Sequence, residues 1–535
     1  MPHAAHASDL ADRTTPIAAT RTAGAKIISR VRVTASMSAA MKPRAASPRP
    51  PHAPWATGWA AFLLLLLWAV ALRAHDFGNP IIHVDEQYYL LVGDRMLHGA
   101  LPYVDLWDRK PVGLFLIFAA IRLLPGDGIL AYQLVATLFA AATAWAVARG
   151  GRMLGARPVA ALVAGAAYIL WLSLLSGRGG QSPVFYNLFT AGAALLTLRL
   201  PALAAARATR AIVVNGAAAC LLAGLAIQTK YTPVVEGAFF GAAHLWYLRR
   251  AGATLPLCLG AAVLWMALGI LPTGLIVADY WRRGPAVFDA FWFSNFASVS
   301  LRKGYPAAKI AARLAGTTAQ LLPFILCTAV ALRQRPWSGE RTLAFGWLTA
   351  ALVAFAMIGA FFDHYALPLM VPLAMIAAPV LDRHRAAPVA LIGYGLTLFV
   401  ARVALPPTDA ASARAVGQVM KANDRGQCPY VFAGDSVLYL LADACIPTRY
   451  AFPSTLAYDA ERGASGADEV AELRRILATR PPVIVTMDEP MAPWNPATEA
   501  MMQATLTRDY RQVLSAPRED AHLLVYLRRD LPLRR

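Results

Sequence analysis

The chain has 535 residues, of which 58% are hydrophobic and 15% charged, and its formal net charge is +19 at pH 7. Its mean hydropathy of +0.47 is too high for a soluble globular protein and excludes that class. The positive charge lies largely in short loops between apolar segments. It therefore reports membrane topology, and we expect no nucleic-acid partner.

The N-terminal residues 1–54 are rich in Ala, Arg, Pro and Ser and show no helical periodicity. This composition is typical of disordered segments. We expect a disordered basic tail on the cytoplasmic side of a membrane.

Eleven apolar runs follow, and each is long enough to cross a hydrocarbon core of roughly 30 Å. The sequence thus predicts a polytopic α-helical membrane protein with about 11 transmembrane helices over residues 55–405. A cleavable signal peptide is the alternative for the first run. The runs are 55–72, 129–148, 158–176, 183–199, 211–228, 231–248, 255–279, 313–332, 342–361, 365–381 and 387–405.

Arginines in alternate loops indicate the orientation of the helices, since positive residues stay preferentially on the cytoplasmic side. With the basic tail inside, only one crossing can separate the external segment after Leu72 from the internal loop 149–157. The thirteen-residue apolar stretch Val112 to Leu124 is therefore not a span, and 73–128 form one external loop. The arginines are Arg149, Arg152 and Arg157; Arg199, Arg207 and Arg210; Arg249 and Arg250; Arg333, Arg335 and Arg341; Arg383 and Arg385.

Residues 406–535 are mixed and charged, which predicts a small α/β domain on the outer side, because eleven crossings from an internal N-terminus end outside. Cys428 and Cys445 both lie in this domain, and an oxidising compartment makes them a candidate disulfide. The expected strands are Tyr430–Ala433, Val483–Thr486 and His522–Leu527, and the expected helices are Glu469–Thr479 and Thr498–Leu506.

Residues suited to chemistry gather in the external loop. Asp85 and Glu86 follow the first apolar run, and apolar residues recur at helical spacing after them. Asp85 is thus expected near the N-terminus of an amphipathic helix, where the helix dipole favours its ionised form. Simple capping by Asp85, with a solvated Glu86 beside it, is the structural alternative.

Several short motifs carry a family resemblance. They are Asp85-Glu86-x-Tyr88-Tyr89, His98-Gly99-Ala100-Leu101-Pro102-Tyr103-x-Asp105, Trp107-Asp108-Arg109-Lys110-Pro111, Gly224-x-x-x-x-Thr229-Lys230-Tyr231 and His364-Tyr365-x-x-Pro368. This order resembles bacterial members of the GT-C glycosyltransferase superfamily, in particular the protein O-mannosyltransferase and lipid A aminoarabinose transferase group. The resemblance covers roughly residues 55–405.

The resemblance implies a glycosyltransferase of the bacterial inner membrane that takes a sugar from a polyprenyl-phosphate-linked donor. Transfer would take place on the periplasmic or extracellular face, to an envelope glycan, a glycolipid or a protein. Asp85 matches the general base that deprotonates the acceptor, with Glu86 beside it. Lys110, assisted by Arg109, matches the cation that binds the donor phosphate, whose growing charge needs fixed positive groups.

Other candidates are His364 for the donor phosphate and Asp108, Lys230 and Arg302 for the substrate groove. Several relatives carry an acid directly before the Lys-Pro, where this chain has Arg109. A divalent metal held by Glu86 and Asp108 is therefore only a minor alternative.

Three further polar residues have no assigned role. Glu236 lies inside an apolar run, where an ionisable side chain is functional by default, but no partner is recognisable in the sequence. Arg178 and Gln181, in a short outer loop, could touch either substrate, but nothing in the sequence distinguishes them from solvent-facing loop residues.

Two rival functions stay open. One is a transporter or flippase of lipid-linked or amphipathic solutes, although we recognise no internal repeats and find the polar residues at the outer helix ends. The other is a non-catalytic protein that binds lipid-linked sugars.

Overall fold

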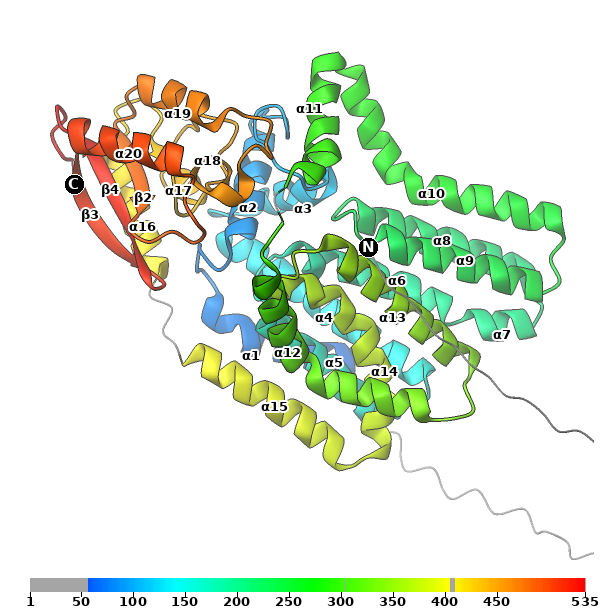
Figure 1. Cartoon of the computed structure of the whole chain (residues 1–535). Coiled ribbons are helices and arrows are strands. Elements are labelled where there is room, and N and C mark those ends of the chain that lie inside the picture. The colour runs from blue at the N-terminus through cyan, green and yellow to red at the C-terminus, as the bar shows by residue number, and fades with distance from the viewer. Residues whose placement is uncertain (1–55, 303, 405–408, 535) are drawn as a thin grey trace, which may run out of the picture. The chain divides into compact units, whose positions relative to one another are not determined.

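The computed structural model describes residues 56–302, 304–404 and 409–534, so the expected tail at 1–54 lies outside it (Figure 1). Eleven long helices match the eleven apolar runs. They are α1 (Gly58–Arg73), α4 (Ile129–Met153), α5 (Pro158–Leu174), α6 (Ser182–Thr197), α8 (Thr209–Ile227), α9 (Val234–Arg250), α10 (Leu255–Arg282), α12 (Ala307–Arg333), α13 (Gly339–Ile358), α14 (Met370–Arg383) and α15 (Ala386–Val403).

Nine spans in the described part of the chain are long and apolar enough to cross a membrane. The short helices η2 (Ala74–Asp76), α7 (Leu200–Ala205) and η4 (Asp363–Leu369) extend three of them. The other two expected crossings correspond to α5 and α9, which have 17 residues each. The predicted polytopic helical membrane fold is confirmed.

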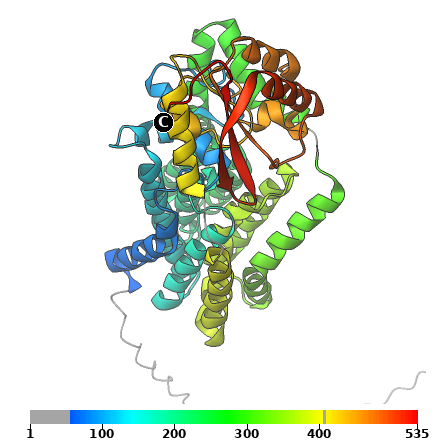
Figure 2. The same cartoon turned by 90° about the vertical axis from the view of Figure 1, so that its left-hand side faces the viewer.

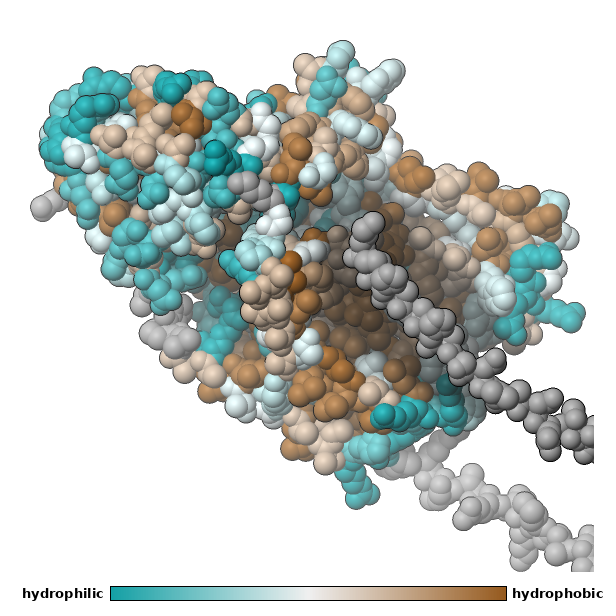
Figure 3. Space-filling model, viewed as in Figure 1, coloured by the Kyte–Doolittle hydropathy of each residue, from teal (hydrophilic) through white to brown (hydrophobic). Residues whose placement is uncertain are grey.

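The helices bury small residues against one another and expose large apolar ones. A Cβ at Gly165 of α5 would lie 2.6 Å from the carbonyl oxygen of Ala144 in α4, so glycine permits this close approach. By contrast, Val263 of α10 and Val389 of α15 are 63% and 75% exposed, which suits contact with lipid tails. Figure 3 shows hydrophobic side chains over the bundle and hydrophilic ones over the C-terminal domain.

Two short helices, α2 (Val84–Leu97) and α3 (Val112–Arg122), lie between α1 and α4. At 11 residues, α3 is too short to span a bilayer, as expected. Helix α2 is not amphipathic in the expected sense, because every residue from Glu86 to Asp94 is buried. One face packs on α3, and the C-terminal domain covers polar side chains that would otherwise meet solvent: Arg95 donates to the carbonyl of Ala444 at 2.7 Å.

The C-terminal domain contains a four-stranded sheet in the order β1-β2-β4-β3, in which β1 and β2 are parallel and the other neighbours antiparallel. Helix α16 packs against β3 and β4 (Figure 2). Cys428 and Cys445 form a disulfide. The elements are α16 (Asp409–Asn423), β1 (Tyr430–Val431), α17 (Leu438–Leu441), α18 (Ser454–Ala457), η5 (Asp459–Glu461), α19 (Glu469–Ala478), β2 (Val483–Met487), α20 (Pro496–Asp509), β3 (Tyr510–Arg518) and β4 (Ala521–Arg528).

The arginine-rich loops meet at one end of the bundle. Arg157, before α5, forms an ion pair of 2.7 Å with Asp382 at the end of α14. Arg341, in the first turn of α13, donates to the carbonyl of Gln334 at 2.8 Å, and Arg383 contacts the Gln334 side chain. The loops that the charge pattern places inside therefore share one end.

Candidate active site

Five segments meet at the other end of the bundle. They are the start of α2, the loop before α3, the α5–α6 turn, the α8–α9 turn and η4. They bring together a group that we call the Asp85 cluster: His83, Asp85, Lys110, Gln181 and His364.

The start of α2 leaves the Asp85 carboxylate available for contacts outside its own helix. The N-cap residue is His83, whose Nδ1 accepts a hydrogen bond from the backbone N–H of Asp85 at 3.2 Å. Gln181, from the α5–α6 turn, donates through Nε2 to Oδ2 of Asp85 at 3.3 Å. The same Nε2 lies 2.7 Å from His83 Nδ1. Asp85 is therefore not the residue that caps α2, because His83 does so.

The charges of the cluster stabilise one another. Burial alone would raise the pKa of Asp85, but the charges of Lys110 and His83 outweigh it and hold that pKa well below its usual range. For Lys110, burial would lower the pKa, but Asp85 raises it well above the usual value. Burial lowers the pKa of His83 to about 4. At neutral pH the cluster therefore holds a carboxylate, an ammonium group and a neutral His83.

Aromatic side chains and a second cation continue the cluster. The rings of His83 and His364 are 5.3 Å apart, and His364 lies 4.5 Å from the ring of Tyr365. The Nζ of Lys230 lies 4.4 Å from the Tyr365 ring centre. Burial, with the charge of Lys110 adding to it, lowers the pKa of Lys230 to about 7. The charges of Lys110 and Asp85 thus both act on Lys230, which belongs to the same site.

Other residues expected in the site are held elsewhere. Arg109 forms an ion pair of 2.7 Å with Glu461 of the C-terminal domain and donates to Ser298 at 3.1 Å. Arg302 binds the second oxygen of Glu461 at 2.9 Å. Asp108 is close enough for its charge to act on Lys110, and burial raises the pKa of Asp108. Asp108 thus borders the cluster, while Arg109 and Arg302 connect the membrane domain to the C-terminal domain.

Glu86 has a different environment from its neighbour Asp85. Its side chain is fully buried, and its Oε2 accepts a hydrogen bond of 2.5 Å from the backbone N–H of Gly180. A Cβ at Gly179 would lie 1.7 Å from the same oxygen, so only glycine fits there. Arg73 donates to the carbonyl of Gly179 at 2.7 Å and supplies positive charge near Glu86. Glu86 therefore packs against the α5–α6 turn, outside the Asp85 cluster.

No group of three or more His, Cys, Asp or Glu side chains is placed to hold a metal ion in the part of the chain that the structure describes. Glu86 contacts the α5–α6 turn, whereas Asp108 accepts from the backbone of Arg109. The two carboxylates proposed as metal ligands thus have separate surroundings.

We expect Glu86→Gln to change the stability of the folded protein and to leave unchanged the rate of the sugar transfer that the family resemblance implies. Burial raises the pKa of Glu86 to about 7 from 4.5, with only partial opposition from Gly180 and Arg73. Between pH 4.5 and 7 the Glu86 carboxyl ionises in the unfolded chain but stays protonated in the folded one. The free energy of unfolding therefore falls by about 3 kcal/mol over this pH range. The variant should lack this pH dependence in thermal-unfolding midpoints. A transfer rate as low as that of an Asp85 variant would contradict the packing role.

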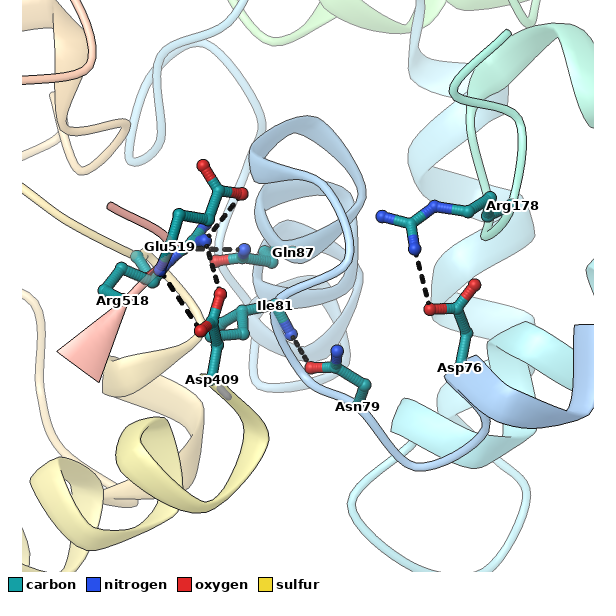
Figure 4. A network of polar contacts seen from close by, with 9 residues as sticks. Asp76, Asn79, Ile81, Gln87, Arg178, Asp409, Arg518 and Glu519 are labelled. Atoms are coloured by element: carbon teal, nitrogen blue, oxygen red, sulfur yellow. Dashed lines mark hydrogen bonds and ion pairs between the residues drawn. The ribbon is translucent and has the colours of Figure 1, made fainter. Parts of the chain in front are cut away.

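The C-terminal domain holds α2 through a buried polar network (Figure 4). Gln87, two residues after Asp85, donates to Asp435 Oδ1 at 2.8 Å. Arg518 donates to both oxygens of Asp435, at 2.8 and 3.1 Å, and to Asp409 at 3.0 Å. Gln87, Asp435 and Arg518 are all at most 3% exposed. The network links the helix that carries Asp85 to strand β3.

A Gln87→Met variant tests whether this network positions Asp85. It removes the hydrogen bond to Asp435 without changing a charge. A small displacement of a reacting group costs up to about 100-fold. For the sugar transfer that the family resemblance implies, we expect kcat to fall about 10- to 100-fold with donor KM little changed. The control is Arg414→Gln, which removes an exposed pair of 3.3 Å with Asp127 between the same two domains. Equal kcat values for both variants would contradict the positioning role.

Several contacts were not expected from the sequence. The sequence did not distinguish Gln181 and Arg178 from solvent-facing residues, but Gln181 is 1% exposed and Arg178 forms an ion pair of 2.9 Å with buried Asp76. Glu236 accepts a hydrogen bond of 2.6 Å from the indole N–H of Trp347. Each partner lies far away in sequence. The glycines of the α5–α6 turn are the feature of the sequence that indicated a close approach of another segment to that turn.

No protein-family model matches the chain, and no curated protein sequence does. Solved structures match it. ArnT from Cupriavidus metallidurans, a GT-C superfamily member, aligns with a TM-score of 0.57 both bound to undecaprenyl phosphate and in the apo state. The alignments cover 88% of this chain and 98% of that chain, at 15% and 14% identity.

The chain has the GT-C fold. The Archaeoglobus fulgidus oligosaccharyltransferase in its apo form also aligns, with a TM-score of 0.49 and 11% identity over 86% of this chain and 80% of that one. The GT-C fold expected from the short motifs is confirmed.

Proposed function

We propose that the chain is a membrane glycosyltransferase that moves a sugar from a polyprenyl-phosphate-linked donor to an acceptor hydroxyl on the non-cytoplasmic face. The acceptor class is an envelope glycan, a glycolipid or a protein. The observation that carries the proposal is the Asp85 cluster itself, in which the α5–α6 turn and η4 bring Gln181 and His364 to His83 and Asp85, at the helix ends opposite the arginine-rich loops.

The cluster suits the chemistry of such a transfer. Asp85 removes the proton from the acceptor hydroxyl as the acceptor oxygen attacks the anomeric carbon of the sugar. The bond between that carbon and the phosphate oxygen breaks, and polyprenyl phosphate leaves with the electron pair. Lys110, with Lys230 and His364 nearby, offsets the charge that grows on the phosphate.

The donor class is supported by two independent features. Lys110 and Lys230 both act on Asp85, and a bound phosphate would favour the charged form of Lys230, whose pKa burial lowers to about 7. The similar ArnT structure is bound to undecaprenyl phosphate, a lipid phosphate of the proposed leaving-group type.

The test uses mass spectrometry to compare the cell envelopes of the parent strain, a deletion strain and the deletion strain complemented with the wild-type gene. We expect one glycolipid, glycan or glycoprotein to lose the mass of one sugar in the deletion strain, with the lipid-linked donor accumulating. Complementation with the Asp85→Asn gene should not restore that mass.

The rival transporter or flippase predicts a different result. Purified chain in vesicles would then move a labelled lipid-linked sugar or amphipathic solute across the bilayer without forming a glycosylated product. Such uptake at wild-type rate in Asp85→Asn protein would overturn the proposal.

A further inference from the structure

An arginine-lined cleft lies at the end of the bundle opposite the Asp85 cluster. It has a volume of about 740 Å³ and is formed by the end of α6, the residues after α7 and the first turns of α8. Arg199, Arg207 and Arg210 line it together with Thr209 and Asn215, and none of the described acidic side chains does.

The three arginines differ from Arg157 and Arg341, which are bound by neighbouring residues at this end of the bundle. Arg157 and Arg341 bind Asp382 and Gln334, whereas the three guanidinium groups of the cleft make no ion pair or side-chain hydrogen bond to any residue that the structure describes. The cleft therefore holds uncompensated positive charge.

The backbone adds hydrogen-bond donors to the same cleft. Helix α8 begins after Ala208 without a side-chain cap. The N–H groups of its first turn, including those of Arg210 and Ala211 in the cleft wall, have no acceptor within the helix. Such donors beside arginines suit a phosphate group.

The cleft also has an apolar side that continues along α8. Leu196, Val214 and Ala218 line it, and Val214 is 64% exposed on a helix long enough to cross a bilayer. A free phosphate ion would use only the arginines, whereas a phospholipid would use both the arginines and this apolar side.

We propose that this cleft binds the phosphate headgroup of an anionic membrane phospholipid, whose acyl chains lie along α8. By the charge pattern, this lipid belongs to the cytoplasmic leaflet. The site is separate from the Asp85 cluster and does not depend on the proposed transfer reaction.

The test uses the full chain, purified and exchanged into bilayers of equal parts phosphatidylglycerol and phosphatidylcholine, with the lipids that stay bound counted by native mass spectrometry. We expect wild-type protein to retain phosphatidylglycerol preferentially. Arg207→Gln with Arg210→Gln should lower that preference roughly 10- to 30-fold. The matched control, Arg250→Gln with Arg385→Gln, removes two exposed arginines outside the cleft and should keep it.

Two outcomes would overturn the proposal. One is an equal loss of preference in both double variants, which would mean that overall charge decides. The other is displacement of phosphatidylglycerol by inorganic phosphate at constant ionic strength, which would make the site one for free phosphate. If the cleft variant does not fold, Arg199→Gln alone should lower the preference, and an unchanged preference would count against the site.

Discussion

In an Asp85→Asn variant, we expect the rate of sugar transfer to fall by about 10²- to 10⁴-fold, which is the usual contribution of a general base. Asparagine keeps the shape of the side chain and its contact with Gln181 but has no basic oxygen. The measurement is the single-turnover transfer rate of purified protein with a lipid-linked donor. Donor binding should change much less, because Lys110 remains.

The control for this variant is Glu86→Gln, the neighbouring acid, which should retain transfer. The pH profile gives a second check. Because the pKa of Asp85 lies well below its usual range, the base is ionised throughout neutral pH, and its acid limb lies below about pH 4. A wild-type rate in folded Asp85→Asn protein would refute the role of base.

Lys110→Ala should lower the rate by about 10²- to 10³-fold, the cost of losing one preorganised group that stabilises developing charge. It should also move the acid limb of the pH profile upward. Without Lys110, the pKa of Asp85 rises because burial is less opposed, so Asp85 takes up a proton at a higher pH and loses activity there.

The matched control is Lys421→Ala, which makes the same chemical change at a side chain 61% exposed in the C-terminal domain. It should leave both rate and pH profile near those of the wild type. An acid limb that stays in place in Lys110→Ala protein would mean that Lys110 does not interact with Asp85 as inferred.

The sequence predicted the membrane domain well because its signals are local. A run of apolar residues marks a helix wherever it packs, and arginines in alternate loops report orientation without any tertiary contact. The same charge pattern predicted that Val112–Leu124 is not a span, and the structure has an 11-residue helix there. In the C-terminal domain, β3 was missed because Arg511, Gln512 and Pro517 mask its alternation, and pairing with β4 stabilises it.

The candidate site could be predicted only in part. The start of α2 and Lys110 were recognised from short motifs in one loop. Asp85 and Glu86 were treated as one pair, although successive residues on a helix point in directions about 100° apart. The structure turns Glu86 toward Gly180 and leaves Asp85 facing Gln181. Sequence spacing cannot show which of two adjacent acids meets which neighbouring turn.

By itself, the sequence determined a multi-pass helical membrane protein and indicated candidate site residues at the helix ends opposite the arginine-rich loops. Only the tertiary structure decided the partners of those residues. Gln87 meets Asp435, and Arg109 meets Glu461, across separations of 348 and 352 positions. Apolar runs and positive charges determine how a segment interacts with the bilayer, and each segment does so independently of the others. Contacts between distant side chains depend on how all the segments pack together.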